Sequence, residues 1–348
     1  MQQIHLTEQI SDSIDYKQQL FPFTATRHMS DIRVGILTIR EKWEYVGADV
    51  LDHGEPGDKK IAANLVPSNY FLENFRSGIL PDAEGQRTIS FPWEIFQLND
   101  WAIRQDYELI TNGRKSEPIQ KGTYANNESQ IFIEEGASVG SCWLNASSGP
   151  IYIGRNAVIM DGTMIMGPVA ICEGAVIKMG TKIYGATTIG PRCVAGGEIK
   201  NSMMMGYSNK AHDGYLGDSV LGEWCNLGAG TSNSNMKNTA GDVSMWVPSL
   251  NASKVVGNKC GLIMGDYSRA SINTSFNTGT MVGVCANVFG SGLTPKYIPS
   301  FSWGTDGTTK ASIDKTLEHI TNWKKLKQKE LTEPEVQALR HIFAHSKF

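Results

Sequence analysis

The fold is decided by a stretch that reads Ile153-Gly-Arg-Asn-Ala-Val-Ile159-Met-Asp-Gly-Thr-Met-Ile165-Met-Gly-Pro-Val-Ala-Ile171. An isoleucine stands at every sixth position, and the same spacing continues at Ile177, Ile183 and Ile189. Helices repeat about every 3.6 residues and strands about every 2, so a sustained period of six indicates a solenoid of short strands and turns. Three hexads would form one triangular coil whose isoleucines stack inside. We therefore predict a parallel β-helix.

Length and composition exclude several classes of protein. The 348 residues suffice for two or three domains, and a formal charge of −3 with no basic block argues against nucleic acid as a partner. No apolar run reaches the roughly 18 residues that cross a bilayer, and the first residues lack a signal pattern, so we expect a cytoplasmic protein with no membrane partner. The six cysteines include no C-x-x-C pair, which predicts reduced core residues and no metal site.

The six-residue register divides the chain into three parts. Residues 1–125 do not share it and should form a small α/β domain, residues 126–300 should form the β-helix, and residues 301–348 should form a helical tail. The polar stretch Thr231-Ser-Asn-Ser-Asn-Met-Lys-Asn238 interrupts the later coils and predicts a projecting loop.

Helices are expected in both flanking parts. Apolar spacing favours helices at 31–43 and 91–101 before the solenoid, and at 311–331 and 336–343 after it. The last of these follows Thr332-Glu-Pro-Glu335, which has the form of a capping box with proline in the first turn. A lysine cluster near the end of the first tail helix is best explained as a solvated helix face.

Polar residues that can carry chemistry gather where the isoleucine register loosens. Glu198-Ile-Lys-Asn-Ser202 is followed by Lys210-Ala-His-Asp-Gly-Tyr-Leu-Gly-Asp218, and His212 is the only histidine of the predicted solenoid. An imidazole ordinarily titrates near neutral pH and can serve as a general base, although a lone histidine is more often an ordinary surface or core residue.

These stretches resemble the β-helix domain of the bifunctional N-acetylglucosamine-1-phosphate uridyltransferase and glucosamine-1-phosphate acetyltransferase family. That family reads E-x-K-N-S/T, K-A-G-H-L-x-Y-L-G-D, N-I-G-A-G-T and N-Y-D-G in this order. The present chain continues the match with Asn226-Leu-Gly-Ala-Gly-Thr231 and Asn235, and no gap is needed from His212 to Asn235. The resemblance implies a mainly β fold, a left-handed parallel β-helix of hexapeptide repeats, preceded by a small nucleotidyltransferase-like α/β domain and followed by helices.

The resemblance also implies roles for individual residues. His212 would be the general base that removes a proton from a sugar amine as the amine attacks the thioester of acetyl-CoA. The sugar phosphate would be bound by a set of polar side chains. These are Lys178, Lys200, Tyr215, Asn226 and Asn235. Such solenoids pack side by side, so we expect a homotrimer with its sites between subunits.

Departures from the family pattern leave the identity of the acceptor sugar undecided. Lys178, in Ile177-Lys-Met-Gly-Thr-Lys-Ile183, stands where the family has a phosphate-binding arginine, which replaces a planar bidentate group by a point charge. Met236-Lys-Asn238 replaces Tyr-Asp-Gly, and one residue fewer separates Lys210 from His212.

The N-terminal part has a second, shorter resemblance. Leu20-Phe-Pro-Phe-Thr-Ala-Thr-Arg27 is similar to the opening of sugar-nucleotidyltransferase domains, where a loop of the type L-A-A-G-x-G-T-R cradles nucleotide phosphates. Here Thr26-Arg27 is present and the loop glycines are absent. Arg27, Arg33 and Lys42 are the candidates for binding a nucleotide phosphate, and structural salt bridges explain these charges equally well.

Three functions are therefore compatible with the sequence. The first is an acetyl-CoA-dependent acyltransferase acting on an amino-sugar phosphate or nucleotide sugar of cell-envelope metabolism. The second is a nucleotidyltransferase that joins a sugar 1-phosphate to UTP or dTTP with Mg²⁺ in the N-terminal part. The third is a sugar-nucleotide-binding protein without turnover.

Overall fold

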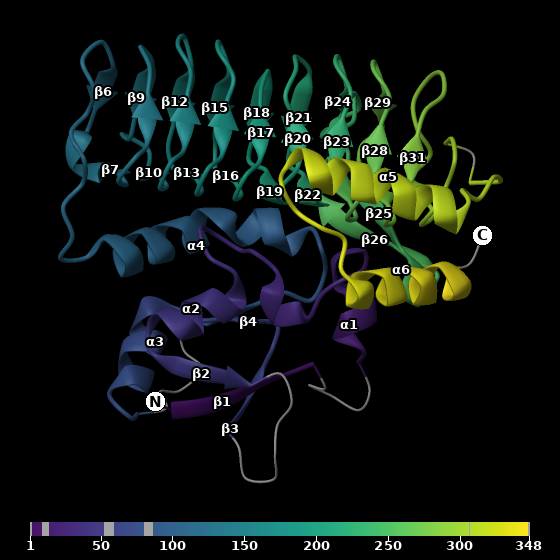
Figure 1. Ribbon diagram of the computed structural model, residues 1–348, viewed down its shortest axis with the longest axis horizontal. Helices are drawn as coiled ribbons and strands as arrows, with labels where there is room; N and C mark the ends of the chain where they lie inside the picture. The colour runs from purple at the N-terminus through teal and green to yellow at the C-terminus, as the bar shows by residue number, and fades with distance from the viewer. Residues whose placement is uncertain (1, 9–13, 52–58, 80–85, 306, 347–348) are drawn as a thin grey trace.

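A computed structural model describes residues 2–8, 14–51, 59–79, 86–305 and 307–346. Its centre is a solenoid of short parallel strands that form three sheets running along the molecule (Figure 1). The first sheet contains β7 (Ile131–Ile133), β10 (Ile151–Ile153), β13 (Val169–Ile171), β16 (Thr187–Ile189), β19 (Met203–Gly206), β22 (Val220–Glu223), β27 (Leu262–Met264), β30 (Thr280–Val282) and β32 (Tyr297–Ile298).

The other two sheets complete each coil. The second sheet contains β8 (Ser138–Val139), β11 (Val158–Ile159), β14 (Val176–Ile177), β17 (Val194–Ala195), β20 (Asn209–Lys210), β23 (Asn226–Leu227), β28 (Arg269–Ala270) and β31 (Asn287–Val288). The third contains β6 (Tyr124–Asn126), β9 (Trp143–Asn145), β12 (Met164–Met166), β15 (Lys182–Tyr184), β18 (Glu198–Lys200) and β21 (Tyr215–Gly217), and the pair β24 (Ser232–Asn233) and β29 (Ser275–Phe276) follows it. A short 3-10 turn, η3 (Glu128–Gln130), precedes β7.

The isoleucine spacing translates directly into this architecture. Ile153 pairs with Ile171 and Ile171 with Ile189 in the first sheet, so three hexads make one coil of eighteen residues. All seven isoleucines of the ladder are at most 2% exposed and belong to one continuous core. Buried β-branched side chains of this kind pack well against neighbouring strands. The predicted β-helix of hexapeptide repeats is confirmed.

The coils become shorter where the sequence register loosens. Ala195 pairs with Lys210, fifteen residues along the chain rather than eighteen, and the next pairing joins Asn209 to Asn226, seventeen residues along. The missing residues come from the corners between strands, because the strands themselves stay in register. This is the region that holds the candidate catalytic stretch.

In its described residues, the N-terminal part contains a small parallel sheet and four α-helices. Its strands β1 (Gln2–Thr7), β2 (Ala48–Leu51) and β3 (Lys59–Ala62) pair in the order β2-β1-β3, and a separate antiparallel pair joins β4 (Leu65–Val66) to β5 (Arg87–Thr88). The helical elements are α1 (Tyr16–Gln19), η1 (Phe23–Ala25), η2 (Met29–Asp31), α2 (Ile39–Tyr45), α3 (Asn69–Arg76) and α4 (Glu94–Thr111). The division of the chain at residue 125 stays a prediction.

Two helix predictions for this part were inaccurate at their boundaries. The helix expected at 31–43 begins only at Ile39, because Thr38 and Glu41 form a capping box that fixes its first turn there. The helix expected at 91–101 continues to Thr111, since apolar residues continue along one face and include the buried Ile103 and Ile110.

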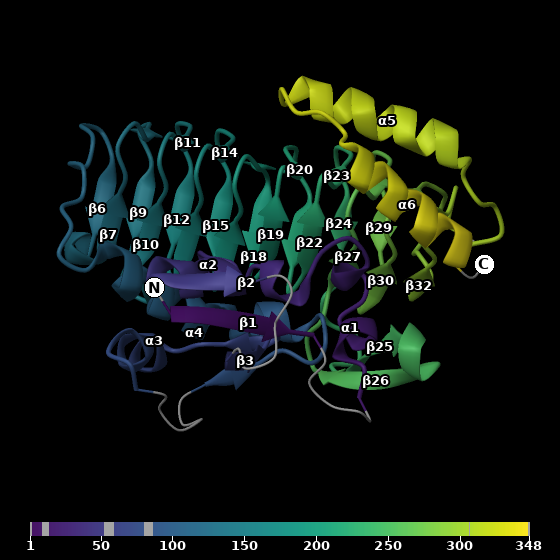
Figure 2. The ribbon, with the colours of Figure 1, turned by 60° about the horizontal axis from the view of Figure 1, so that its bottom comes forward.

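The N-terminal part covers the outer face of the first sheet (Figures 1 and 2). An antiparallel hairpin, β25 (Val243–Val247) and β26 (Ala252–Gly257) joined by η4 (Pro248–Leu250), extends from the coils on the same side. The loop predicted at 231–238 starts later than expected, because Ser232 and Asn233 still form a solenoid strand. One core unites the N-terminal part, the outer face of the coils and the hairpin; it includes Ile4, Phe23, Met203, Val220 and Met245.

Two C-terminal helices, α5 (Ile313–Leu326) and α6 (Glu333–His345), cover another part of the solenoid. They pack on aromatic residues at the coil corners, among them Trp224, Tyr267 and Phe301. The predicted capping box of Thr332 and Glu335 is present. The lysine cluster is not simply a solvated face, because Lys324 is 5% exposed and forms an ion pair with Glu335.

The outer face of the third sheet is open over its first coils. Tyr124, Trp143, Met164 and Met166 stand side by side there and are between 44% and 60% exposed. Elsewhere, all six cysteines are buried and free. In the part of the chain that the structure describes, no helix combines the length and apolar character needed to cross a membrane.

Candidate functional site

A hydrogen-bonded cluster forms at the end of the third sheet. Asn235 donates through Nδ2 to the Tyr215 hydroxyl at 3.1 Å and also to the Asp218 carboxylate. Asn201 donates to the other carboxylate oxygen at 2.7 Å. Asp218 is 4% exposed, so its two amide partners replace the water that a carboxylate needs. Burial, followed by the charge of Asp218, raises the pKa of Tyr215 and keeps its hydroxyl protonated.

Lys200 lies on the strand next to Tyr215. It pairs with Gly217 in the sheet, and its ammonium lies 5.6 Å from the ring centre of Tyr184. The Tyr184 hydroxyl donates to Glu198 at 2.6 Å, a bond that raises the tyrosine pKa to about 12. The outer face of these strands therefore presents a cation beside hydroxyl and carboxamide groups, the types of group that bind a sugar phosphate.

His212 occupies the exposed corner between β20 and β21. Two residues separate it from Tyr215, so the corner that carries His212 leads directly into the strand that carries Tyr215. Its backbone carbonyl accepts a hydrogen bond at 2.5 Å from the ammonium of Lys210, which is itself 2% exposed. Burial lowers the pKa of Lys210 to about 8.

The two remaining predicted ligands, Asn226 and Lys178, lie outside the cluster of Tyr215. Asn226 lies on β23, in the second sheet, and pairs with Asn209 and Arg269 rather than with the cluster of Tyr215. Lys178 directly follows β14 and is partly exposed at the corresponding corner of an earlier coil. Thus Tyr215 and Asn235 are in contact, Lys200 is on the adjacent strand, and Asn226 and Lys178 lie on other faces or coils.

Sequence reasoning missed four residues that shape this region. Tyr184, Asn201, Lys210 and Asp218 make the contacts described above, yet none was assigned a role. Lys210 and Asp218 belong to the matched motif itself, so the motif held the signal. Only the coil register reveals that Asn201 and Asp218 directly follow β18 and β21 of the third sheet, and that Asn235 comes after β24 in the strand pair beyond it.

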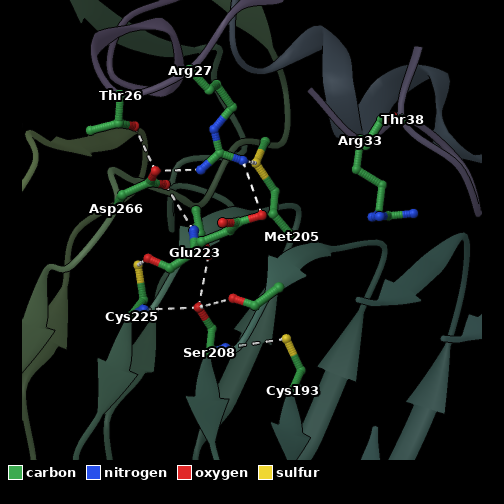
Figure 3. Close-up of polar contacts among 12 residues, drawn as sticks. Thr26, Arg27, Arg33, Thr38, Cys193, Met205, Ser208, Glu223, Cys225 and Asp266 are labelled. Carbon is green, nitrogen blue, oxygen red and sulfur yellow. Dashed lines mark hydrogen bonds and ion pairs between the residues drawn. The ribbon is translucent and has the colours of Figure 1, made fainter. Parts of the chain in front are cut away.

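The three N-terminal candidates for nucleotide binding are held in internal ion pairs. Arg27 is paired with Asp266 and lies 3.5 Å from Glu223, and its side chain is 9% exposed (Figure 3). Thr26 donates to the same Asp266 carboxylate at 2.6 Å, and Arg27 also contacts the sulfur of Met205. The loop that would bind phosphates in a nucleotidyltransferase is thus bound to the solenoid.

Arg33 and Lys42 have similar environments. Arg33 lies apart from the Arg27 cluster (Figure 3) and forms an ion pair with Glu41 at 3.2 Å. Lys42 is 1% exposed and forms an ion pair with Asp106. Asp106 additionally accepts hydrogen bonds from the backbone N–H groups of Ile36 and Leu37. These contacts match the structural salt bridges that the sequence had left as an alternative.

Comparisons with known proteins relate the chain to sugar-nucleotide enzymes. Residues 10–53 match a family described as sugar nucleotidyl transferase. The bifunctional protein GlmU of Methanocaldococcus jannaschii is 36% identical over 86 residues, which is 25% of this chain and 21% of the relative. The bifunctional sugar-1-phosphate nucleotidylyltransferase/acetyltransferase of Sulfurisphaera tokodaii is 29% identical over 203 residues, which is 58% of this chain and 44% of the relative. The predicted resemblance is confirmed.

The chain spans less than half of the length of each of these curated relatives. Among solved structures, an LpxA described as a UDP-N-acetylglucosamine acyltransferase, from Bacteroides fragilis, aligns over 66% of this chain and 98% of its own, at 17% identity and a TM-score of 0.25. Within the described residues, no group of three or more His, Cys, Asp or Glu side chains is placed to hold a metal ion.

Proposed function

We propose that this protein is an acyltransferase that transfers an acetyl group from acetyl-CoA to the amine of an amino-sugar phosphate or nucleotide sugar. The observation that carries the proposal is the contact between Tyr215 and Asn235, on a strand that directly follows the exposed corner of His212. These three residues keep the spacing of the related acetyltransferase motif without a gap. Relatives named as bifunctional nucleotidylyltransferase/acetyltransferases support the same class of reaction.

His212 acts as the general base in the proposed step. The amine nitrogen attacks the thioester carbonyl carbon while the imidazole takes the proton that the amine loses. The carbon–sulfur bond then breaks, and the departing thiolate of coenzyme A receives that proton. Lys200, Tyr215 and Asn235 bind the phosphate and hydroxyl groups of the acceptor, and Lys178 and Asn226 extend the site from neighbouring surfaces.

The proposed assembly is a homotrimer with its sites between subunits. The exposed strip of Tyr124, Trp143, Met164 and Met166 on the third sheet supports this arrangement, because a contiguous apolar face is what a subunit contact would bury. The strip and the cluster of Tyr215 share one sheet, so a neighbour seated on the strip would border the site.

The test is acetyl transfer by the purified protein across a panel of amino-sugar phosphates and nucleotide sugars. We expect His212→Asn to lower kcat by about a hundredfold or more, the usual contribution of a general base. His341→Asn is the matched control, since His341 is an exposed histidine of α6 far along the chain. Full activity of His212→Asn, or no transfer by the wild type to any acceptor, would refute the proposal.

A second candidate function is sugar-1-phosphate nucleotidyl transfer with Mg²⁺, which the family match at residues 10–53 favours. The ion pairs of Arg27, Arg33 and Lys42 count against it, because each cation already has an internal partner. Pyrophosphate release from UTP or dTTP with a sugar 1-phosphate would support this function. Binding of nucleotide sugars with neither pyrophosphate release nor acetyl transfer would indicate a binding protein without turnover.

A further inference from the structure

Lys210 occupies a position that is apolar in every other coil. The last residue of each second-sheet strand points into the solenoid core and is at most 6% exposed. In chain order these residues are Val139, Ile159, Ile177, Ala195, Lys210, Leu227, Ala270 and Val288. A lysine in such a place loses the hydration of its charge, which is costly unless the ammonium is hydrogen-bonded.

The ammonium of Lys210 binds two backbone carbonyls at the corner that follows the second sheet. Its Nζ lies 2.9 Å from the oxygen of Gly196 and 2.5 Å from that of His212. Gly196 directly follows Ala195, the strand partner of Lys210. The ammonium therefore joins the corners of two consecutive coils, and one of these corners carries His212.

Other coils satisfy the equivalent carbonyls with a buried threonine. Thr181 donates to the oxygen of Lys178, and Thr274 donates to that of Ser271. Thr163 donates to its own corner and to the next one, through the oxygens of Met160 and Lys178. Like Gly196, each of these acceptors directly follows the inward residue of a second-sheet strand. In the His212 coil, Gly214 occupies the place of the threonine.

We propose that Lys210 is the positioning residue of this site, replacing the corner threonine and holding the backbone turn from which His212 projects. The inference rests on the proposed acyltransferase function. Gly214 gives the turn a conformation with φ of 125°, which other residues rarely adopt. The backbone oxygens of Asp213 and Gly214 accept hydrogen bonds from neighbouring coils, and the carbonyl of His212 depends on Lys210. The two hydrogen bonds of Lys210 restrain the same turn at His212 itself. A restrained turn favours the productive placement of the imidazole over unproductive ones.

The first experiment compares Lys210→Met with Thr274→Val by hydrogen exchange of backbone amides. Lys210→Met keeps the length of the side chain and removes the ammonium, and Thr274→Val removes the equivalent corner bond two coils away. We expect exchange at 211–214 to rise about tenfold or more in Lys210→Met alone, because local opening becomes easier. Unchanged exchange at this turn would overturn the proposal.

The second experiment measures acetyl transfer by the same variants. Lys210→Met should lower kcat about tenfold or more while the KM of the acceptor changes less than about twofold, because misplacing a base slows the step without removing a ligand. Thr274→Val should keep wild-type kcat. Lys210→Gln, which retains a donor, should recover part of the loss and also serves if the methionine variant does not fold. Wild-type kcat in both Lys210 variants would overturn the proposal.

The two hypotheses fail in different ways. If the wild type transfers no acetyl group, the proposed function is refuted, and the exchange comparison still decides whether Lys210 holds the turn. If the wild type is active and His212→Asn is not, but both Lys210 variants match the wild type in kcat and exchange, then only the positioning role is refuted.

Discussion

Lys210 places a titratable charge inside the solenoid, and its pKa makes the stability of the protein depend on pH. The folded-state pKa is about 8, below the ordinary lysine value of about 10.4 that holds in the unfolded chain. Below pH 8 both states carry the proton and the folded state bears the cost of the buried charge. Between pH 8 and 10.4 the unfolded state binds more protons, so stability rises with pH in this window.

The contribution of Lys210 to this pH dependence can be measured by comparing the wild type with Lys210→Met. We expect the unfolding free energy of the wild type to gain up to about 3 kcal/mol between pH 7.5 and 10.4 relative to Lys210→Met, the amount that corresponds to the shift. Urea denaturation at the two pH values measures it. A constant difference between the two proteins would mean that the lysine is neutral or hydrated at both pH values.

For single residues, the sequence indicated which side chains belong to the candidate site better than it indicated their contacts. The family resemblance implied that Asn235 lies beside Tyr215, and the two side chains are in contact. The sequence could not indicate that Lys210 points inward, because a lysine in a polar stretch is ordinarily solvated. Its orientation depends on the coil register, which is shortened just there.

Single strands gain their stability from the inward ladder. Ile171 is fully buried between Ile153 and Ile189, so Ile171→Ala should lower the unfolding free energy by about 2 to 5 kcal/mol. Ile272→Ala is the matched control, because Ile272 is 67% exposed and should change stability by less than about 0.5 kcal/mol. Equal midpoints for the two variants in urea denaturation would contradict the ladder as the main stabilising contact.

The loop that contains Thr26 and Arg27 resembles a phosphate-binding loop, yet in this fold it attaches the N-terminal part to the solenoid. Arg27→Met should cost about 3 to 5 kcal/mol, because it leaves the buried Asp266 without its cation. Arg340→Met removes an exposed pair with Asp314 and should cost about 1 kcal/mol or less. The comparison uses unfolding free energies in urea. A small loss in Arg27→Met would show that the loop is not needed to attach the N-terminal part.

Elements were predictable where a local signal sets them. The capping box of Thr332 fixed the start of α6, and the isoleucine period fixed the strands from β10 to β16. The hairpin of β25 and β26 was not predicted, since its apolar residues are explained only by the core that they share with Ile4 and Phe23. Contacts so distant in sequence leave no local pattern to read.

At the scale of the whole molecule, the described residues leave the outer face of the third sheet uncovered over its first coils. Trp143→Glu would place a charge in the middle of the exposed strip on the third sheet, and we expect it to convert the proposed trimer into monomers in sedimentation velocity. Tyr70→Glu changes a residue of similar exposure on α3 and should leave the assembly intact. A monomeric wild type, or a trimeric Trp143→Glu variant, would contradict a subunit contact at this strip.

The core shared by the N-terminal part, the hairpin and the outer face of the coils also limits how the protein can be divided. Met203 and Val220 face outward from the solenoid, yet both are fully buried because Ile4, Phe23 and their neighbours cover them. A fragment that began after residue 125 would expose this apolar surface to water, and the detached N-terminal piece would expose its counterpart. A repeat protein could in principle fold coil by coil. Here each of the two parts covers apolar surface of the other, so either part produced alone should aggregate rather than fold.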